Sequence, residues 1–151
     1  MKIEQEINQQ KPFTNNYQKA AVNIMFTASW LGKKQSDALK PLDLTIQQYN
    51  ILRILKGLNG DPATIKLLTE RMIDKMSNAS RLVDKLLAKE LVRRDECQDD
   101  RRRVDIFISE KGLKILHKAS EALENLFTDP HLELNLEDAG ILSDLLDRIR
   151  E

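Results

Sequence analysis

The chain has 151 residues with 24 lysine and arginine side chains and 24 aspartates and glutamates, so its formal net charge is zero. This length suits one domain whose core is large enough to fold without disulfides or a metal ion. The single cysteine excludes an internal disulfide and a multi-cysteine zinc site. The sequence opens on a polar segment and has no long apolar run, so we expect no signal peptide, no membrane span and a cytoplasmic location.

The charge is unevenly distributed. Residues 1–63 carry eight positive and five negative side chains, residues 64–103 eleven and eight, and residues 104–151 five and eleven. A neutral chain with this distribution can still present one basic face to a polyanion. The alternative is that the charges only solvate the surfaces of helices.

The first part of the chain predicts a polar, frayed segment over residues 1–13 and then a long helix. From Thr14 to Leu39 apolar side chains recur at steps of three and four residues, which is typical of an amphipathic helix, and Pro41 ends it. Thr45 and Gln48 have the spacing of a capping box, which predicts the start of the next helix.

The middle of the chain predicts two short helices and a β-hairpin. Apolar spacing favours helices over residues 64–72 and 77–90. The period then changes to two, which indicates strands over residues 91–94 and 104–108 with a polar loop over 95–103.

Two more helices are predicted after the hairpin. Ser109 can cap the first, which runs to about Phe127, and Asn135 can cap the second, which follows Pro130. The fold class is therefore mostly α with a small β-hairpin wing. It is a winged helix-turn-helix flanked by N- and C-terminal helical regions.

A winged helix-turn-helix places its second helix in the major groove of DNA, and the hairpin tip reaches phosphates or the minor groove. The outward positions of the second helix carry polar or cationic side chains, namely Ser77, Asn78, Ser80, Arg81 and Lys85. The hairpin loop carries three consecutive arginines at 101–103. Each feature alone is typical of a solvated surface, but their order along the chain favours a DNA-binding function.

In these features the sequence resembles the MarR family of bacterial transcription regulators, over roughly residues 14–150. The resemblance is most specific in three segments: Leu68–Met72, Ser80–Leu86, and Asp100 to Arg102 followed by Ile108–Gly112. It implies that Asp100 is the wing aspartate and that Arg102 enters the minor groove, with Arg101 beside them. The sequence departs from the family at two positions. Ile73 stands where many members have a glycine in the turn. Glu90 stands where glycine is usual, so a left-handed backbone at Glu90 would be strained.

The resemblance also implies an obligate homodimer. It assigns residues 1–151 to a single domain, in which 14–40 and 110–150 form the dimerisation helices and 45–109 the winged helix-turn-helix. These helices have wide apolar faces, and the alternative is that they fold back on their own domain.

Many family members bind small aromatic acids between the two regions, so the resemblance implies an effector pocket. Candidate lining residues are Met25, Phe26, Trp30 and Tyr49, with Arg53 as a carboxylate partner. Core packing is the alternative for these aromatic side chains. We expect no cofactor and no metal.

The sequence indicates no enzyme, since it lacks glycine-rich phosphate motifs and its two histidines, His117 and His131, are not paired with a cysteine. Cys97 is a candidate redox sensor beside Arg93 and Arg94, although its acidic neighbours would raise its pKa. We therefore predict a homodimeric regulator that binds double-stranded DNA at an inverted-repeat operator. The resemblance implies that it represses transcription, and we expect no membrane partner. The alternative function is a winged-helix protein-interaction module that has lost DNA binding.

Overall fold

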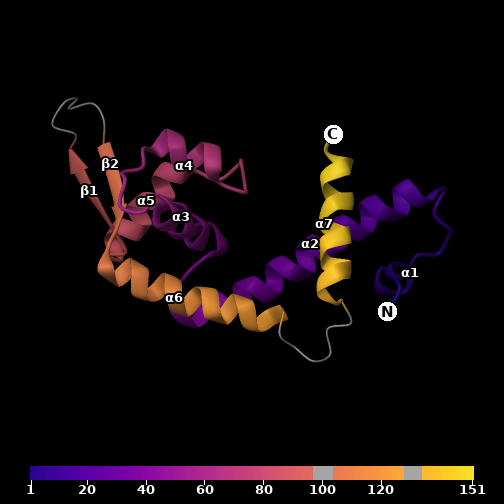
Figure 1. The fold of residues 1–151 in the computed structure, drawn as a ribbon. Helices are drawn as coiled ribbons and strands as arrows, with labels where there is room; N and C mark the ends of the chain where they lie inside the picture. Colours follow the sequence, from indigo (N-terminus) through magenta and orange to yellow (C-terminus); the bar gives the residue numbers. More distant parts are fainter. Residues whose placement is uncertain (97–103, 128–133) are drawn as a thin grey trace.

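The protein is described by a computed structural model over residues 1–96, 104–127 and 134–151. Figure 1 shows the hairpin and the short helices gathered at one end, and the two chain termini at the other end. The helices are α1 (Ile3–Glu6), α2 (Asn16–Leu39), α3 (Ile46–Gly57), α4 (Ile65–Arg71), α5 (Ala79–Ala88), α6 (Glu110–Glu124) and α7 (Leu136–Ile149). Short 3-10 turns η1 (Lys40–Leu42) and η2 (Asn125–Phe127) follow α2 and α6, and the strands are β1 (Val92–Glu96) and β2 (Val104–Ile108).

The three helix caps predicted from the sequence, at Thr45, Ser109 and Asn135, are confirmed. Thr45 Oγ1 accepts a 3.2 Å hydrogen bond from the Gln48 backbone, and Gln48 Oε1 accepts one from the Thr45 backbone. Ser109 and Asn135 accept equivalent bonds from Gly112 and Asp138. These caps satisfy N–H groups that the first turn of a helix leaves without partners.

The expected frayed segment over residues 1–13 is wrong at its start, because α1 forms there. Ile3 is 5% exposed, and Lys19 of α2 lies 2.5 Å from a carboxylate oxygen of Glu4. Ile3 and Ile7 are four positions apart, but two residues are too few for a periodic pattern, so the sequence did not predict this helix or its contact with α2.

The hairpin is antiparallel and pairs Val92 with Ile108 at one end and Glu96 with Val104 at the other. The first strand therefore begins one residue later than predicted and extends into the predicted loop. Backbone bonds of 2.9 Å in both directions join Ala63 to Ile106, which ties the segment before α4 to β2.

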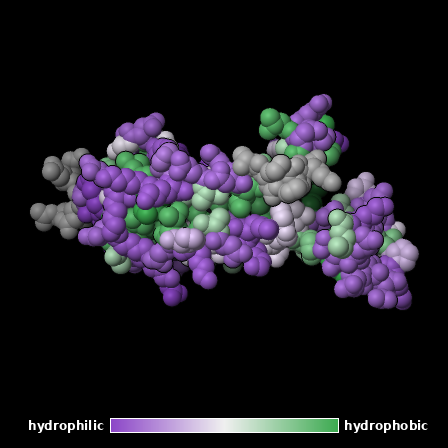
Figure 2. Space-filling view, turned by 90° about the horizontal axis from the view of Figure 1, so that it is seen from below, coloured by the Kyte–Doolittle hydropathy of each residue, from purple (hydrophilic) through white to green (hydrophobic). Residues whose placement is uncertain are grey.

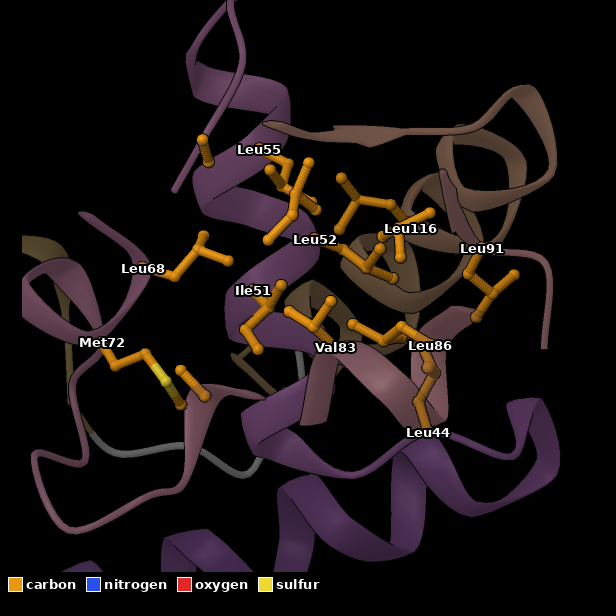
Figure 3. Close-up of a cluster of buried hydrophobic side chains, with 14 of the residues drawn as sticks. Leu44, Ile51, Leu52, Leu55, Leu68, Met72, Val83, Leu86, Leu91 and Leu116 are labelled. Atoms are coloured by element: carbon orange, nitrogen blue, oxygen red, sulfur yellow. The ribbon is translucent and has the colours of Figure 1, made fainter. Parts of the chain in front are cut away.

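One hydrophobic core lies among α3, α4, α5, α6 and the base of the hairpin. Figure 3 shows its side chains converging from these elements, with Ile51 and Leu52 of α3 near the centre. Both residues are fully buried, as are Leu68, Val83, Leu86 and Ile106. This core fixes how α5 lies against α3 and the hairpin.

Outside this core, the helices at the ends of the chain leave apolar side chains open to solvent. No residue of α7 is buried, and α2 buries only Leu39. The exposed apolar side chains of these two helices are Tyr17, Ile24, Met25, Trp30, Leu136, Ile141, Leu142, Leu145 and Ile149. Figure 2 shows hydrophobic surface open between hydrophilic margins on the face seen from below. None of the described helices is long and apolar enough to span a bilayer.

Candidate nucleic-acid interface

Helix α5 has one face in the core and one in solvent. Its buried residues are Ala79, Val83 and Leu86, which recur at helical spacing and pack against α3. Ser80, Arg81 and Lys85 lie on the exposed side. The exposed face of the second helix is therefore polar and carries two cations, together with the carboxylate of Asp84.

The first turn of α5 is fixed by hydrogen bonds from the residues before it. The helix begins at Ala79 rather than at Ser77 as predicted, because Asn78 is the N-cap and its Oδ1 accepts a 3.0 Å bond from the Arg81 backbone. Ser77 Oγ donates a 2.7 Å bond to Asp74 Oδ2. Hydrogen bonds from the Ser77 hydroxyl and the Met76 backbone hold the pKa of the Asp74 carboxyl below its usual range.

A shallow hollow of about 280 Å³ lies along this helix. It is lined by Gln47, Ser77, Asn78, Arg81, Leu82 and Lys85, so the structure brings together four of the five predicted second-helix contacts. Among the described residues, the side chains of Arg81 and Lys85 have no ion-pair partner. Two unpaired cations on one exposed face create a local positive potential, although the net charge of the chain is zero.

The base of the hairpin carries cations that the sequence did not single out as site residues. Arg94 pairs with Asp84 of α5 at 2.9 Å, and the Arg93 guanidinium lies 4.1 Å from the centre of the Phe107 ring and pairs with Asp95. The Arg94–Asp84 pair links β1 to α5. The predicted wing residues Asp100, Arg101 and Arg102, and also Cys97, lie outside the described residues.

The far end of α5 is tied to the loop before α3 by Lys89. Its ammonium lies 3.0 Å from Asp43 Oδ2, contacts the Asp43 carbonyl and lies 3.4 Å from Gln48 Oε1. Gln48 is buried and Asp43 has a left-handed backbone with φ of 52°. These contacts join residues more than forty positions apart, so no local pattern in the sequence could have identified them.

Glu90 has a left-handed backbone with φ of 60°, as we expected from the glycine that is common at this position in the family that the sequence resembles. Its backbone N–H bonds to the Leu87 carbonyl and the next N–H, of Leu91, bonds to the Leu86 carbonyl, both at 2.9 Å. This is the Schellman arrangement that closes a helix. Lys111 lies 2.9 Å from Glu90 Oε2, and its hydrogen bond and charge lower the pKa of the Glu90 carboxyl.

The five residues predicted to line an effector pocket do not lie together. Phe26 and Trp30 line a hollow of about 500 Å³ between α1 and α2, while Met25 is exposed on α2. Tyr49 lies 3.3 Å from the Ser120 hydroxyl of α6, and the Arg53 guanidinium lies 6.0 Å from the Tyr49 ring centre. One chain does not bring all five into a single cavity.

The comparison with protein families agrees with this geometry. A model described as the MarR family matches residues 44–104. The winged helix-turn-helix region of this chain is therefore similar to the MarR family. The match covers α3, α4, α5, β1 and the start of β2, which are the elements that hold the candidate interface.

Solved structures of MarR-type regulators share the fold over most of the chain. The organohalide-sensing RdhR-CbdbA1625 regulator bound to 2,4-dichlorophenol has 23% identity and a TM-score of 0.81, covering 94% of this chain and 86% of that one. A MarR-like regulator from Bacillus cereus ATCC 10987 has 19% identity and a TM-score of 0.76, with 89% and 96% covered. No curated protein sequence matches the chain.

A third structure contains DNA. It is a cysteine-to-serine variant of MarR from E. coli complexed with operator DNA, with 19% identity and a TM-score of 0.76, covering 92% of this chain and 99% of that one. At these identities the likeness shows the fold. The MarR-type winged helix, mostly helical with a two-stranded antiparallel hairpin, is therefore confirmed.

Proposed function

We propose that this protein is a sequence-specific regulator of transcription that binds double-stranded DNA as a homodimer and represses its target. The observation that carries the proposal is the exposed face of α5, on which Arg81 and Lys85 lie without ion-pair partners among the described residues. A helix of this kind fits the major groove, and its N-terminal residues reach base edges.

Each predicted contact has a distinct role in this proposal. Ser77, Asn78, Ser80 and Arg81 lie at or next to the first turn of α5 and read bases. Lys85, one turn further along, contacts a phosphate. In the wing, Arg102 enters the minor groove beside Asp100, and Arg101 adds a phosphate contact.

The homodimer is supported by the apolar side chains that α2 and α7 leave in solvent. A soluble monomer rarely leaves large apolar patches in solvent, and a second copy related by two-fold symmetry would cover these side chains. Two copies of α5 would then contact an inverted repeat.

The proposed effector is a small aromatic acid. Phe26 and Trp30 supply aromatic lining on α2, and the 2,4-dichlorophenol-bound relative supports an aromatic ligand class. A partner subunit would have to complete the pocket, since one chain separates these residues from Tyr49 and Arg53. Such a ligand releases DNA by preferring the DNA-incompetent arrangement, typically by 1–3 kcal/mol. Tryptophan fluorescence and operator release on titration with aromatic carboxylates test this part.

Selection of bound duplexes from a random library tests the main proposal. Enrichment of an inverted repeat, with binding that weakens steeply as salt rises, supports it. If no duplex is retained at low ionic strength, the protein is instead a winged-helix protein-interaction module. The acidic residues of the hairpin region and the zero net charge favour that second function.

A further inference from the structure

Two large apolar side chains stand in solvent in the turn between α4 and α5. Met76 is 93% exposed and Ile73 is 79% exposed. Single exposed apolar residues are common on protein surfaces and by themselves indicate nothing. Met76 differs because it lies two residues before the N-cap of the helix that carries the candidate DNA contacts.

The backbone that carries Met76 is held in place on both sides. Its own N–H donates a 3.0 Å bond to Asp74 Oδ1, while Ser77 Oγ occupies the other oxygen of the same carboxylate. At the start of the turn, the Ile73 N–H donates a 3.0 Å bond to Asn50 Oδ1 of α3, and Met72 is buried in the core. The turn therefore holds the backbone of Met76 in place two residues before the N-cap of α5.

The surroundings of Met76 fit a polyanion that also displays a methyl group. Arg81 and Lys85 supply positive charge along α5, which opposes the nearby carboxylate of Asp74, and both oxygens of that carboxylate accept hydrogen bonds from the turn itself. In the major groove the apolar feature of a base pair is the C5-methyl group of thymine. The unbranched, polarisable thioether of methionine adapts well to such a small apolar contact.

We infer that Met76 determines specificity at the DNA interface by contacting the C5-methyl group of a thymine in the major groove. The inference rests on the proposed DNA-binding function. It adds an apolar contact to a site whose other candidate residues are polar or charged. A docking site for another protein is the competing explanation, and the experiment below distinguishes the two.

The test compares operators that differ only in thymine methyl groups. The full-length protein is first used to select its operator, and each thymine of the half-site core is then replaced by deoxyuridine. For the parent protein, one replacement should weaken binding about fourfold per half-site, the factor that corresponds to one buried methyl group. Met76→Ala should bind the thymine and deoxyuridine operators equally, and Met76→Leu should keep the preference for thymine.

Ile73→Ala is the matched control, because it removes the other exposed apolar side chain of the same turn, five residues before the N-cap of α5. It should retain the parent's ratio of thymine to deoxyuridine affinity. Equal loss in the parent and in Met76→Ala would overturn the inference, as would a parent insensitive to every replacement or a selected half-site without thymine. In those cases DNA binding itself persists, so the proposed function stands. Failure to bind any duplex overturns both, and Met76 then belongs to a protein-contact surface.

Discussion

The carbonyl oxygen of Leu91 lies where a side chain on Gly112 would have to be. A Cβ added at Gly112 would approach this oxygen to 2.0 Å and Ile108 Cγ1 to 2.9 Å. The Ser109 N–H donates a 3.0 Å bond to the same Leu91 carbonyl. The start of α6 is therefore pressed against the residue that leads from α5 into β1, and the absence of a side chain at position 112 allows this close approach.

Gly112→Ala should destabilise the fold, although alanine has the higher helix propensity. Propensity favours alanine by about 1 kcal/mol, but overpacking against a backbone carbonyl typically destabilises by 1–3 kcal/mol or more. We expect a net loss of about 2 kcal/mol in the free energy of unfolding, measured by denaturant titration at fixed protein concentration. Gly57→Ala is the control, since a Cβ there meets nothing within 4 Å. An unchanged Gly112→Ala midpoint would show that the two segments separate readily.

Glu90→Gly should stabilise the protein relative to Glu90→Ala. Both variants lose the contact with Lys111, but only glycine relieves the left-handed backbone at φ of 60°. That conformation disfavours a residue with a Cβ by about 1 kcal/mol, which is the expected difference in unfolding free energy between the two variants. Equal stability of the two would mean that the Schellman turn opens in solution.

The stability contributed by Asp74 should depend on pH. Because its folded pKa is lowered, its contribution is complete above the unfolded pKa, near the usual 3.8, and is lost as pH falls through the lower folded value. Asp74→Ala should therefore lower the unfolding midpoint at pH 7 and have a smaller effect in strong acid. Ser77→Ala should reproduce part of the loss at pH 7. A difference between parent and Asp74→Ala that does not change with pH would contradict this account.

Features encoded by neighbouring residues were predictable from the sequence. The Thr45–Gln48 capping box, the caps at Ser109 and Asn135, the period of the second strand and the strained Glu90 turn each depend on residues a few positions apart. The order of these elements was enough to identify the fold and the exposed face of α5.

Contacts between distant segments were not predictable in the same way. The Lys89–Asp43 and Arg94–Asp84 pairs depend on how α5 lies against the α3 loop and the hairpin, which only the folded core determines. The start of α5 at Ala79 depends on the Asn78 side chain, which caps the helix by accepting a hydrogen bond from the Arg81 backbone. Met76 was missed because an isolated apolar residue in a turn belongs to no periodic pattern.

Leu142→Glu on α7 should shift the protein from dimer to monomer. Leu142 is 45% exposed in the single chain and shares its side of the helix with Leu145 and Ile149. A carboxylate on this face would be buried without a partner in the proposed dimer, which is unfavourable. Sedimentation should show the parent at twice the mass of one chain and the variant as a monomer. Thermal unfolding should give the parent a midpoint that rises with protein concentration and the variant a lower stability.

Ser143→Glu places the same charge on another side of α7 and should leave the dimer intact. A compact parent monomer with a concentration-independent midpoint would exclude an obligate dimer.

Substitutions on α5 should separate base reading from phosphate contact. Arg81 lies in the first turn of the helix, so Arg81→Ala should weaken operator binding by about 1–3 kcal/mol per half-site and relax the preference at one or two base pairs. Lys85 lies one turn later, so Lys85→Ala should weaken all duplexes alike and reduce the salt dependence by about one unit per lost contact. Lys56→Ala, at an exposed lysine in the last turn of α3, is the control and should change neither quantity. The measurement is binding of the selected operator and of a scrambled duplex over a range of salt concentrations. If Arg81→Ala and Lys85→Ala both bind as the parent does, α5 is not the helix that enters the groove, because the loss of a cation that contacts DNA would weaken binding.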